Sequence, residues 1–205
     1  MQLTERQNDA LSELINIAFS RTAASLSELT GHRVVLDVPR VEIYPVHELS
    51  SRLAQFLPDE LASVHQVFTG PLTGDALLLL NYDGAVTLTD LLTDEALRSH
   101  RLNESAREVL TEVGNILLNA CLGVFGNLLQ VRVSFSVPRL HLENLGELVR
   151  SLVIDKEELR YALVVYTAFH VRDSAIKGYL VIALNVVSMD RLIHEVENWE
   201  ERQGQ

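Results

Sequence analysis

The 205-residue chain carries two copies of one sequence pattern, separated by about 100 residues. Three stretches of the first half recur in the second: 13–16 as 112–115, 38–41 as 137–140, and 74–81 as 178–185. The first two pairs share an offset of 99 residues, and the third has an offset of 104, as a small loop insertion would produce. A period this long is typical of a duplicated subdomain, since solenoid repeats are much shorter. We therefore expect a single domain, 1–205, built from two repeats at about 1–100 and 101–205.

Each half shows the same order of periodicities: a long helix, a strand, a short helix, two strands and a helix. In the first half these elements are expected at residues 4–29, 32–44, 48–57, 61–69, 75–81 and 87–97. In the second half they are expected at 103–128, 131–142, 145–152, 160–170, 175–185 and 188–200. Hairpin signals dominate the strand regions. The pattern predicts an α+β fold with a mainly antiparallel sheet, its helices on one face and the long helices on the surface.

Charge and hydropathy exclude several classes of protein. The sequence has 28 Asp and Glu against 17 Lys and Arg, a formal net charge of −11, so neither nucleic acid nor an anionic membrane is an expected partner. No apolar run approaches the roughly 18 to 20 residues that span a bilayer, and the first residues do not form a secretion signal. Cys121 is the single cysteine, so an internal disulfide is excluded. These features predict a soluble, cytoplasmic protein without membrane insertion.

A polar stripe runs along each of the two long predicted helices. At about 100° per residue, one sector of each helix collects equivalent side chains. They are Asp9, Glu13, Asn16 and Ser20 on the first helix, and Glu108, Glu112, Asn115 and Asn119 on the second. The simplest explanation is that each stripe is the solvent-exposed face of an amphipathic helix. Asparagine is a poor helix former, however, so its recurrence in the middle of both helices indicates another role for these stripes.

This pattern resembles the signature of the CheC, CheX and FliY phosphatases of bacterial and archaeal chemotaxis. That signature is Asp or Ser, three residues, Glu, two residues, Asn, and a proline 23 positions later. The first copy matches it in full, and the second has Glu in the first position: Asp9, Glu13, Asn16 and Pro39, then Glu108, Glu112, Asn115 and Pro138. The resemblance covers essentially the whole chain, and two units with two sites is the CheC arrangement.

The resemblance implies an activity and catalytic residues. The chain would remove the phosphoryl group from the aspartate of a CheY-like response regulator in chemotaxis or two-component signalling. Asn16 and Asn115 would orient the attacking water, because a neutral carboxamide bonds water without repelling the phosphoryl anion. Glu13 and Glu112 would pair with the receiver's lysine beside the phosphoaspartate, which fixes each helix against the partner.

The resemblance also implies partners and cofactors. Asp9 and Glu108 would be further contacts to the phosphorylated receiver domain. No cofactor of the chain's own is expected, because the Mg²⁺ of this reaction belongs to the receiver. A CheD-like regulator is left open as a second partner. The seven histidines show no His-x-His or His-x-x-x-His spacing, so the sequence predicts no metal site.

Two functions of different class stay open at this point. One is the aspartyl-phosphate phosphatase, and the other is a non-catalytic binding module that docks a response regulator or another signalling protein. The second stays open because Phe19 and Arg21 are bulky where the family has small residues, and because Glu108 replaces Asp or Ser.

The two sites are not expected to contribute equally. Gly114 lies beside Asn115, and a small residue at that point would let a partner's backbone approach closely. Phe19 lies within one turn of Asn16 and could either obstruct docking or serve as a hydrophobic contact. We therefore expect Asn115 to contribute more to activity than Asn16.

Overall fold

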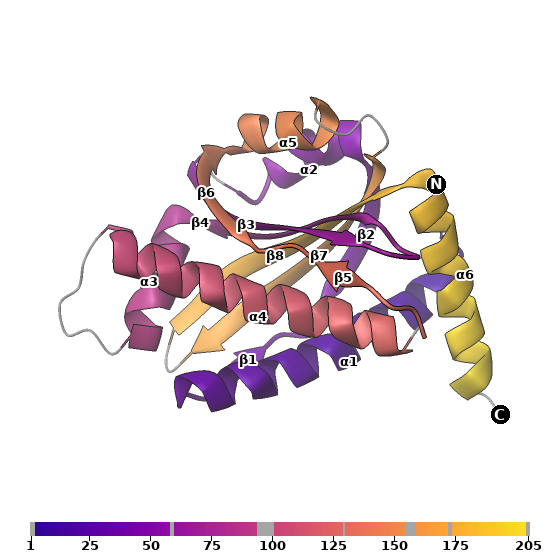
Figure 1. Ribbon diagram of the computed structural model, residues 1–205, viewed down its shortest axis with the longest axis horizontal. Helices are drawn as coiled ribbons and strands as arrows, with labels where there is room; N and C mark the ends of the chain where they lie inside the picture. The colour runs from indigo at the N-terminus through magenta and orange to yellow at the C-terminus, as the bar shows by residue number, and fades with distance from the viewer. Residues whose placement is uncertain are drawn as a thin grey trace.

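The computed structural model describes residues 3–57, 60–93, 101–128, 130–154, 159–171 and 174–203 (Figure 1). The helices are α1 (Glu5–Thr30), α2 (Leu49–Leu53), α3 (Tyr82–Thr93), α4 (Glu104–Leu128), α5 (Leu145–Ile154) and α6 (Val186–Gln203), with a 3₁₀ turn, η1 (Val46–Glu48), before α2. The strands are β1 (Val34–Leu36), β2 (Arg40–Pro45), β3 (Glu60–Thr69), β4 (Gly74–Asn81), β5 (Ser134–Phe135), β6 (Arg139–Asn144), β7 (Leu159–Val171) and β8 (Ser174–Asn185). The predicted α+β class is confirmed. The last predicted residues of the helix at 87–97 lie outside the described residues.

The strands in the described part of the chain form one antiparallel sheet in the order β1-β7-β8-β4-β3-β5. At one edge, β1 and β2 both pair with β7; at the other, β5 and β6 both pair with β3. The central pair is β4 with β8, one strand from each half. The two halves therefore share a sheet, and each half's edge strands pair with a long strand of the other half.

Each of the strands predicted at 32–44 and 131–142 is split in two near a proline. The break lies at Pro39 between β1 and β2, and at Pro138 between β5 and β6. Proline has no N–H to donate and a fixed φ, so it interrupts the ladder. The chain stays attached to the sheet at the second break, because the Ser136 N–H donates to the Val67 carbonyl at 2.9 Å.

Helices cover both faces of the sheet, so the prediction of helices on one face is wrong (Figure 1). α1, α3, α4 and α6 pack on one face, together with Leu78 and Leu80 of β4. η1, α2 and α5 pack on the other face, together with Leu77 and Leu79. A strand covered on both sides is apolar throughout rather than alternating. The run of four leucines in β4 is the sequence signal for this second layer.

Helices α3 and α6 begin earlier than predicted. Asn81 ends β4, and its Oδ1 accepts from the Gly84 N–H at 3.1 Å. Asn185 ends β8, and its Oδ1 accepts from the Ser188 N–H at 2.7 Å. Asparagine is a preferred N-cap because its side chain satisfies a backbone N–H that the helix leaves free. α3 therefore begins five residues before its predicted start, and α6 begins two residues before.

The order of elements is the same in the two halves, and the pairing of edge strands is reciprocal. The duplication of an ancestral unit stays a prediction from the sequence. In the part of the chain that the structure describes, no helix has both the length and the apolar character needed to cross a membrane.

Candidate functional site

Helix α1 carries the first predicted site. Asp9 and Glu13 are exposed on this helix, and Asn16 is half-buried. The opposite side of α1 packs into the core through a row of apolar residues: Leu11, Leu14, Ile15 and Ala18. The spacing of three and four residues sets this division, since such residues share a face. The three polar side chains therefore lie one turn apart along the outer side of the helix.

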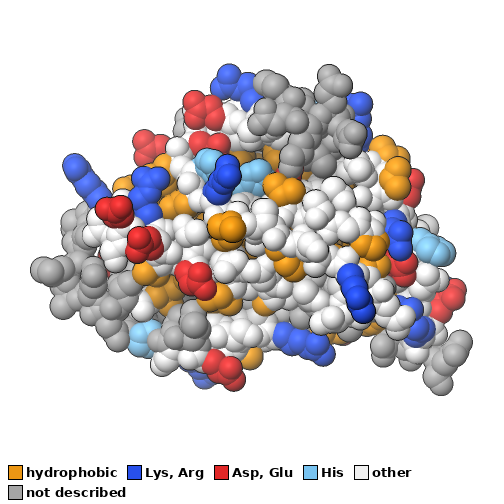
Figure 2. All heavy atoms as spheres, viewed as in Figure 1, with side chains coloured by type: hydrophobic (Ala, Val, Ile, Leu, Met, Phe, Trp, Pro, Cys, Tyr) orange, Lys and Arg blue, Asp and Glu red, His pale blue; other side chains and the backbone are white. Residues whose placement is uncertain are grey.

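Helix α4 carries the second predicted site. Glu108 and Glu112 are exposed, while Asn115 and Asn119 are half-buried at the junction of helix and sheet. Acidic side chains follow the first part of this helix on the face that Figure 2 shows. The side that includes Leu110 packs into the same core as α1. Both predicted pairs, a glutamate and an asparagine one turn apart, are thus accessible from outside.

Behind Asn115 lies a chain of hydrogen bonds that crosses from α4 to the sheet. The Nδ2 group of Asn119 donates to Oδ1 of Asn115. The Nε2 group of Gln66, a buried residue of β3, donates to Oδ1 of Asn119 at 3.1 Å and to the carbonyl of Ser136 at 2.9 Å. We call these four residues the amide chain.

The donor and acceptor of each hydrogen bond in the amide chain can be assigned in only one way. The carbonyl of Ser136 can only accept, so Gln66 must turn its NH₂ group toward it and toward Asn119. Asn119 must then present its oxygen to Gln66 and its NH₂ to Asn115. The amide orientation of Asn115 follows: Oδ1 faces inward with one lone pair used, and the NH₂ group is left as a donor. Hydrogen bonding at its oxygen also polarises this carboxamide.

On α1 the asparagine has no such support. Ser20 stands at the position equivalent to Asn119, and its Oγ donates to the backbone carbonyl of Asn16 at 2.9 Å. The Asn16 carboxamide forms no hydrogen bond with a residue that the structure describes. It can therefore turn over, presenting either its oxygen or its NH₂ group.

Strand pairing identifies the counterpart of Gln66 in the other half. Gln66 follows a residue that pairs with Arg139, and Thr167 follows a residue that pairs with Arg40. The Oγ1 group of Thr167 donates to the carbonyl of Asp37 at 3.2 Å, which repeats the bond from Gln66 to Ser136. A threonine has no second polar group to pass on toward α1, so the chain ends there.

Both reasons that the sequence offered for ranking the two sites are wrong. Phe19 is 5% exposed and packs in the core, so it does not stand over the α1 site. Gly114 is buried against β3, where an added Cβ would lie 2.5 Å from Cγ1 of Val64. The glycine therefore allows α4 to approach the sheet and does not open the helix to a partner. The two sites instead differ in the amide chain, which supports Asn115 and has no equivalent behind Asn16.

Sequence reasoning found Asn119 on the stripe and missed Gln66 and Ser136. Gln66 shares one face of β3 with the buried Val64 and Phe68, and no pattern in the sequence marks a buried glutamine at that position. Ser136 immediately precedes the Val-Pro-Arg segment shared by the halves, but the residues before that segment differ between them. Gln66 and Ser136 come together with Asn119 only because β3 pairs with the segment that contains β5 and because α4 packs against β3.

Neither the cysteine nor a group of metal ligands provides a further reactive site among the residues that the structure describes. Burial raises the pKa of the Cys121 thiol to about 12, which leaves it protonated and inert at neutral pH. Among the described residues, no group of three or more His, Cys, Asp or Glu side chains is placed to hold a metal ion.

The chain resembles two curated proteins at the level of sequence, although no protein-family model matches it. The flagellar motor switch phosphatase FliY of Bacillus subtilis is 24% identical over 147 residues, which cover 71% of this chain and 38% of FliY. The CheY-P phosphatase CheC of the same organism is 24% identical over 170 residues, which cover 81% of both proteins. This chain thus spans little more than a third of FliY and most of CheC.

Solved structures share the fold at low identity. FliY of Thermotoga maritima has a TM-score of 0.78 at 20% identity and covers 97% of this chain and 100% of that one. FliM of H. pylori, solved with SpeE, has a TM-score of 0.70 at 13% identity and covers 97% of this chain and 98% of that one. A CheC-like protein of Shewanella sp. PV-4 has a TM-score of 0.53 at 10% identity and covers 83% of this chain and 96% of that one. Sequence relatives and fold neighbours together support the assignment of this chain to the CheC/CheX/FliY family, which the repeated motif predicts.

Proposed function

We propose that this protein is a phosphatase that hydrolyses the aspartyl phosphate of a CheY-like receiver domain. The observation that carries the proposal is the orientation of Asn115, which stands one turn from the exposed Glu112 and is backed by three hydrogen bonds of the amide chain. A carboxamide that positions a reactant must be held in one orientation, whereas one that only contacts solvent need not be. The name of the CheC relative, a CheY-P phosphatase, supports the substrate.

In the proposed reaction a water oxygen attacks phosphorus in line with the bond to the receiver's aspartate. The P–O bond to that aspartate breaks, and inorganic phosphate leaves. Asn115 donates from Nδ2 to a phosphoryl oxygen, and the free lone pair of its Oδ1 accepts from the water. Asn16 has the same role at the first site with less support. Positioning of this kind supplies roughly 10²-fold, about 3 kcal/mol.

The carboxylates of the two stripes recognise the receiver. Glu13 and Glu112 are exposed and reach a lysine beside the phosphoaspartate, and Asp9 and Glu108 make contacts one turn further along. The net charge of −11 does not attract an acidic receiver site, so these local pairs carry recognition. Mg²⁺ is held by the receiver, and the proposal requires no metal in this chain.

The setting proposed for this activity is the cytoplasm, where response regulators are phosphorylated. The phosphorylated CheY-like regulator is the proposed partner, and a CheD-like regulator is a second one. The acidic balance of the chain, 28 acidic against 17 basic residues, supports partners other than nucleic acid.

A second candidate function is a binding module that docks a signalling protein without hydrolysing it. The fold likeness to FliM favours it, because FliM was solved in complexes with SpeE and with FliG. In this case the exposed glutamates form contacts to the partner, and the asparagines have no reactant to position.

The decay of a phosphorylated CheY-like receiver separates the two functions. The receiver is phosphorylated, its phosphoryl donor is removed, and its decay is followed with and without this protein. The phosphatase predicts decay that is faster at catalytic amounts of protein. Binding of the phosphorylated receiver at an unchanged decay rate would instead select the binding module.

A further inference from the structure

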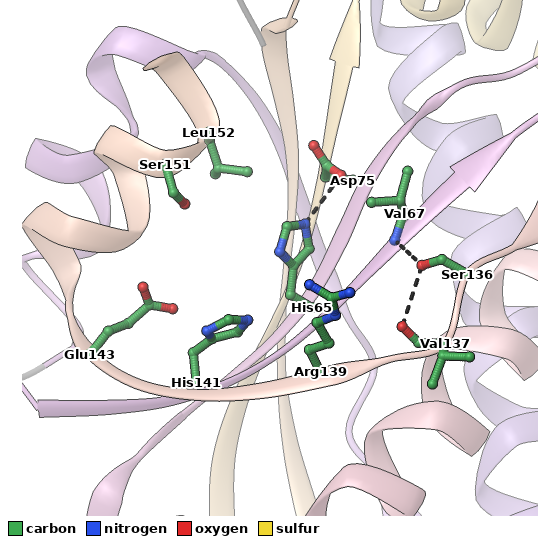
Figure 3. A pocket seen from close by; sticks show the side chains of 10 residues that line it. All are labelled: His65, Val67, Asp75, Ser136, Val137, Arg139, His141, Glu143, Ser151 and Leu152. Atoms are coloured by element: carbon green, nitrogen blue, oxygen red, sulfur yellow. Dashed lines mark hydrogen bonds and ion pairs between the residues drawn. The ribbon is translucent and has the colours of Figure 1, made fainter. Parts of the chain in front are cut away.

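A hollow of about 560 Å³ lies on the face of the sheet that carries α5, away from the asparagines of α1 and α4. Strands β3, β4 and β6 and helix α5 contribute its walls, and Figure 3 shows their side chains converging on it. Its polar lining consists mainly of ionisable groups: His65, Asp75, Arg139, His141 and Glu143. This volume lies in the range of small-molecule sites, and none of these five residues takes part in the proposed phosphatase reaction.

The floor of the hollow holds a buried carboxylate. The side chain of Asp75 is 1% exposed, and its Oδ1 lies 3.1 Å from Nε2 of His65. The other ring nitrogen of His65 points away from Asp75 toward the open space (Figure 3). Burying a charged group costs several kcal/mol of folding free energy unless it is paired. A buried carboxylate is therefore not expected at a position whose only role is packing. Ionisable groups of this kind in a hollow are typical of binding and catalytic sites.

The wall formed by β6 adds three further ionisable side chains, Arg139, His141 and Glu143. Arg139 pairs directly with His65 across the β3–β6 ladder, so both side chains point to the same face. The ring of His141 lies beside that of His65, with 6.4 Å between the centroids. Glu143, at the other end of the hollow, accepts from the hydroxyl of Ser63.

The arginine of the hollow is not paired with either of its carboxylates. Asp75 faces His65, and Glu143 is hydrogen-bonded to Ser63. The guanidinium of Arg139 forms no ion pair with any residue among those the structure describes. A planar guanidinium with several donors matches the oxygens of a carboxylate or a phosphate group.

The equivalent place in the other half of the sheet is filled. Arg40 pairs with Tyr166 across the β2–β7 ladder, as Arg139 pairs with His65. The Tyr166 ring lies 5.4 Å from that of Phe56 and 5.6 Å from that of Tyr179, and the Arg40 guanidinium lies 4.9 Å over its centre. Aromatic packing therefore satisfies the fold at this position. At the place of His65 and Arg139, a hollow with ionisable walls from both halves of the chain stands where this aromatic packing would be.

We propose that the hollow beneath α5 binds a small anion, held through a carboxylate or phosphate group by Arg139 and the imidazoles of His65 and His141. The Asp75 carboxylate lies behind the His65 ring, beside Nε2, and orients the ring electrostatically. This site lies on the opposite face of the sheet from Asn16 and Asn115, and Ser136, whose carbonyl ends the amide chain, lines its edge. The proposal does not rest on the proposed phosphatase activity.

Proton–nitrogen and proton–carbon NMR of the intact chain tests the proposal. The ring signals of His65 and His141 are followed while inorganic phosphate or, in a second arm, succinate is added at constant pH and ionic strength. We expect a saturable shift of both rings with at least one of the two anions below about 10 mM. Saturation with phosphate alone assigns a phosphate group, and saturation with succinate alone assigns a carboxylate.

Two matched variants decide whether the shift comes from this hollow. Arg139→Ala should weaken binding about 10-fold or more, because a charge-assisted bond is lost. Arg40→Ala removes the equivalent arginine beside the filled half and should leave binding unchanged. Both arginines are exposed, so both variants should fold. The absence of a saturable shift with either anion would overturn the proposal, as would equal weakening by the two variants.

Discussion

Helices α1 and α4 carry the same glutamate and asparagine on their outer sides, yet the protein behind the two asparagines differs. Asn115 accepts from Asn119, and Asn119 accepts from Gln66, which also donates to the carbonyl of Ser136. Asn16 is free to turn, because the side chain of Ser20 bonds the backbone instead. A side chain that is already ordered loses less entropy when it engages a reactant. The repeated motif thus specifies two accessible faces, and residues outside it specify one ordered carboxamide.

The comparison indicates where a repeated motif stops being informative. The helical spacing of Glu and Asn fixes which side of each helix they occupy. It does not fix which side chains the sheet beneath presents, since β3 has Gln66 where β7 has Thr167. Equivalent motifs on one fold can therefore have unequal activity.

The largest expected effect comes from removing both asparagines. Asn16→Ala combined with Asn115→Ala should abolish the accelerated decay of a phosphorylated receiver, a loss of roughly 10²-fold, because no carboxamide is left to position the water. Circular dichroism should show an unchanged fold, since both side chains are partly exposed. Wild-type acceleration in the double variant would disprove the carboxamide mechanism.

The next effect concerns the amide chain itself. Asn119→Asp keeps the shape of the side chain and can still accept from Gln66, but its carboxylate cannot donate to Asn115. We expect about a 10-fold slower turnover with the affinity for the receiver nearly unchanged, which corresponds to about 1.4 kcal/mol. The side-chain amide signals of Asn115 should shift in the same variant.

Ser20→Ala is the matched control on α1, at the position equivalent to Asn119. It removes only a bond to a backbone carbonyl, so turnover should stay within about twofold of wild type. If Asn119→Asp has as little effect as Ser20→Ala while Asn115→Ala is inactive, the amide chain does not position Asn115.

The smallest expected effect concerns the stability of the protein and the close packing of α4 on β3 at Gly114. Gly114→Ala should lower the free energy of unfolding by about 1 to 3 kcal/mol, because the new methyl group would lie 2.5 Å from Val64 and force α4 from β3. Gly123→Ala is the matched control on the same helix, where an added Cβ meets nothing within 4 Å. That change should raise stability by up to about 1 kcal/mol, as alanine favours helix. Denaturant titration of both variants measures the difference, and equal stabilities would mean that α4 does not rely on Gly114.

The sequence predicted features that depend on local periodicity. The long helices, the hairpins of β3–β4 and β7–β8 and the outer position of Glu112 all follow from spacing along one element. The second helical layer was missed, because a strand buried on both faces looks the same whichever elements cover it. The early start of α3 was missed because the capping role of Asn81 depends on where β4 ends.

The site could be predicted only as far as its own helix. Gln66 and Ser136 lie 49 and 21 residues from Asn115 in the chain, and only the pairing of β3 with the β5–β6 region and the packing of α4 bring them together. The interpretation of Gly114 failed for the same reason, because the neighbour that requires it, Val64, lies on another element.

The most direct test of this account measures the two asparagines separately under identical conditions. Asn115→Ala and Asn16→Ala are each compared with wild type in the decay of a phosphorylated CheY-like receiver at limiting amounts of protein. The account predicts that Asn115→Ala removes more than half of the acceleration and Asn16→Ala less than half, because only Asn115 is held by the amide chain. The reverse order would contradict it, and would mean that the complete signature beginning at Asp9 sets activity.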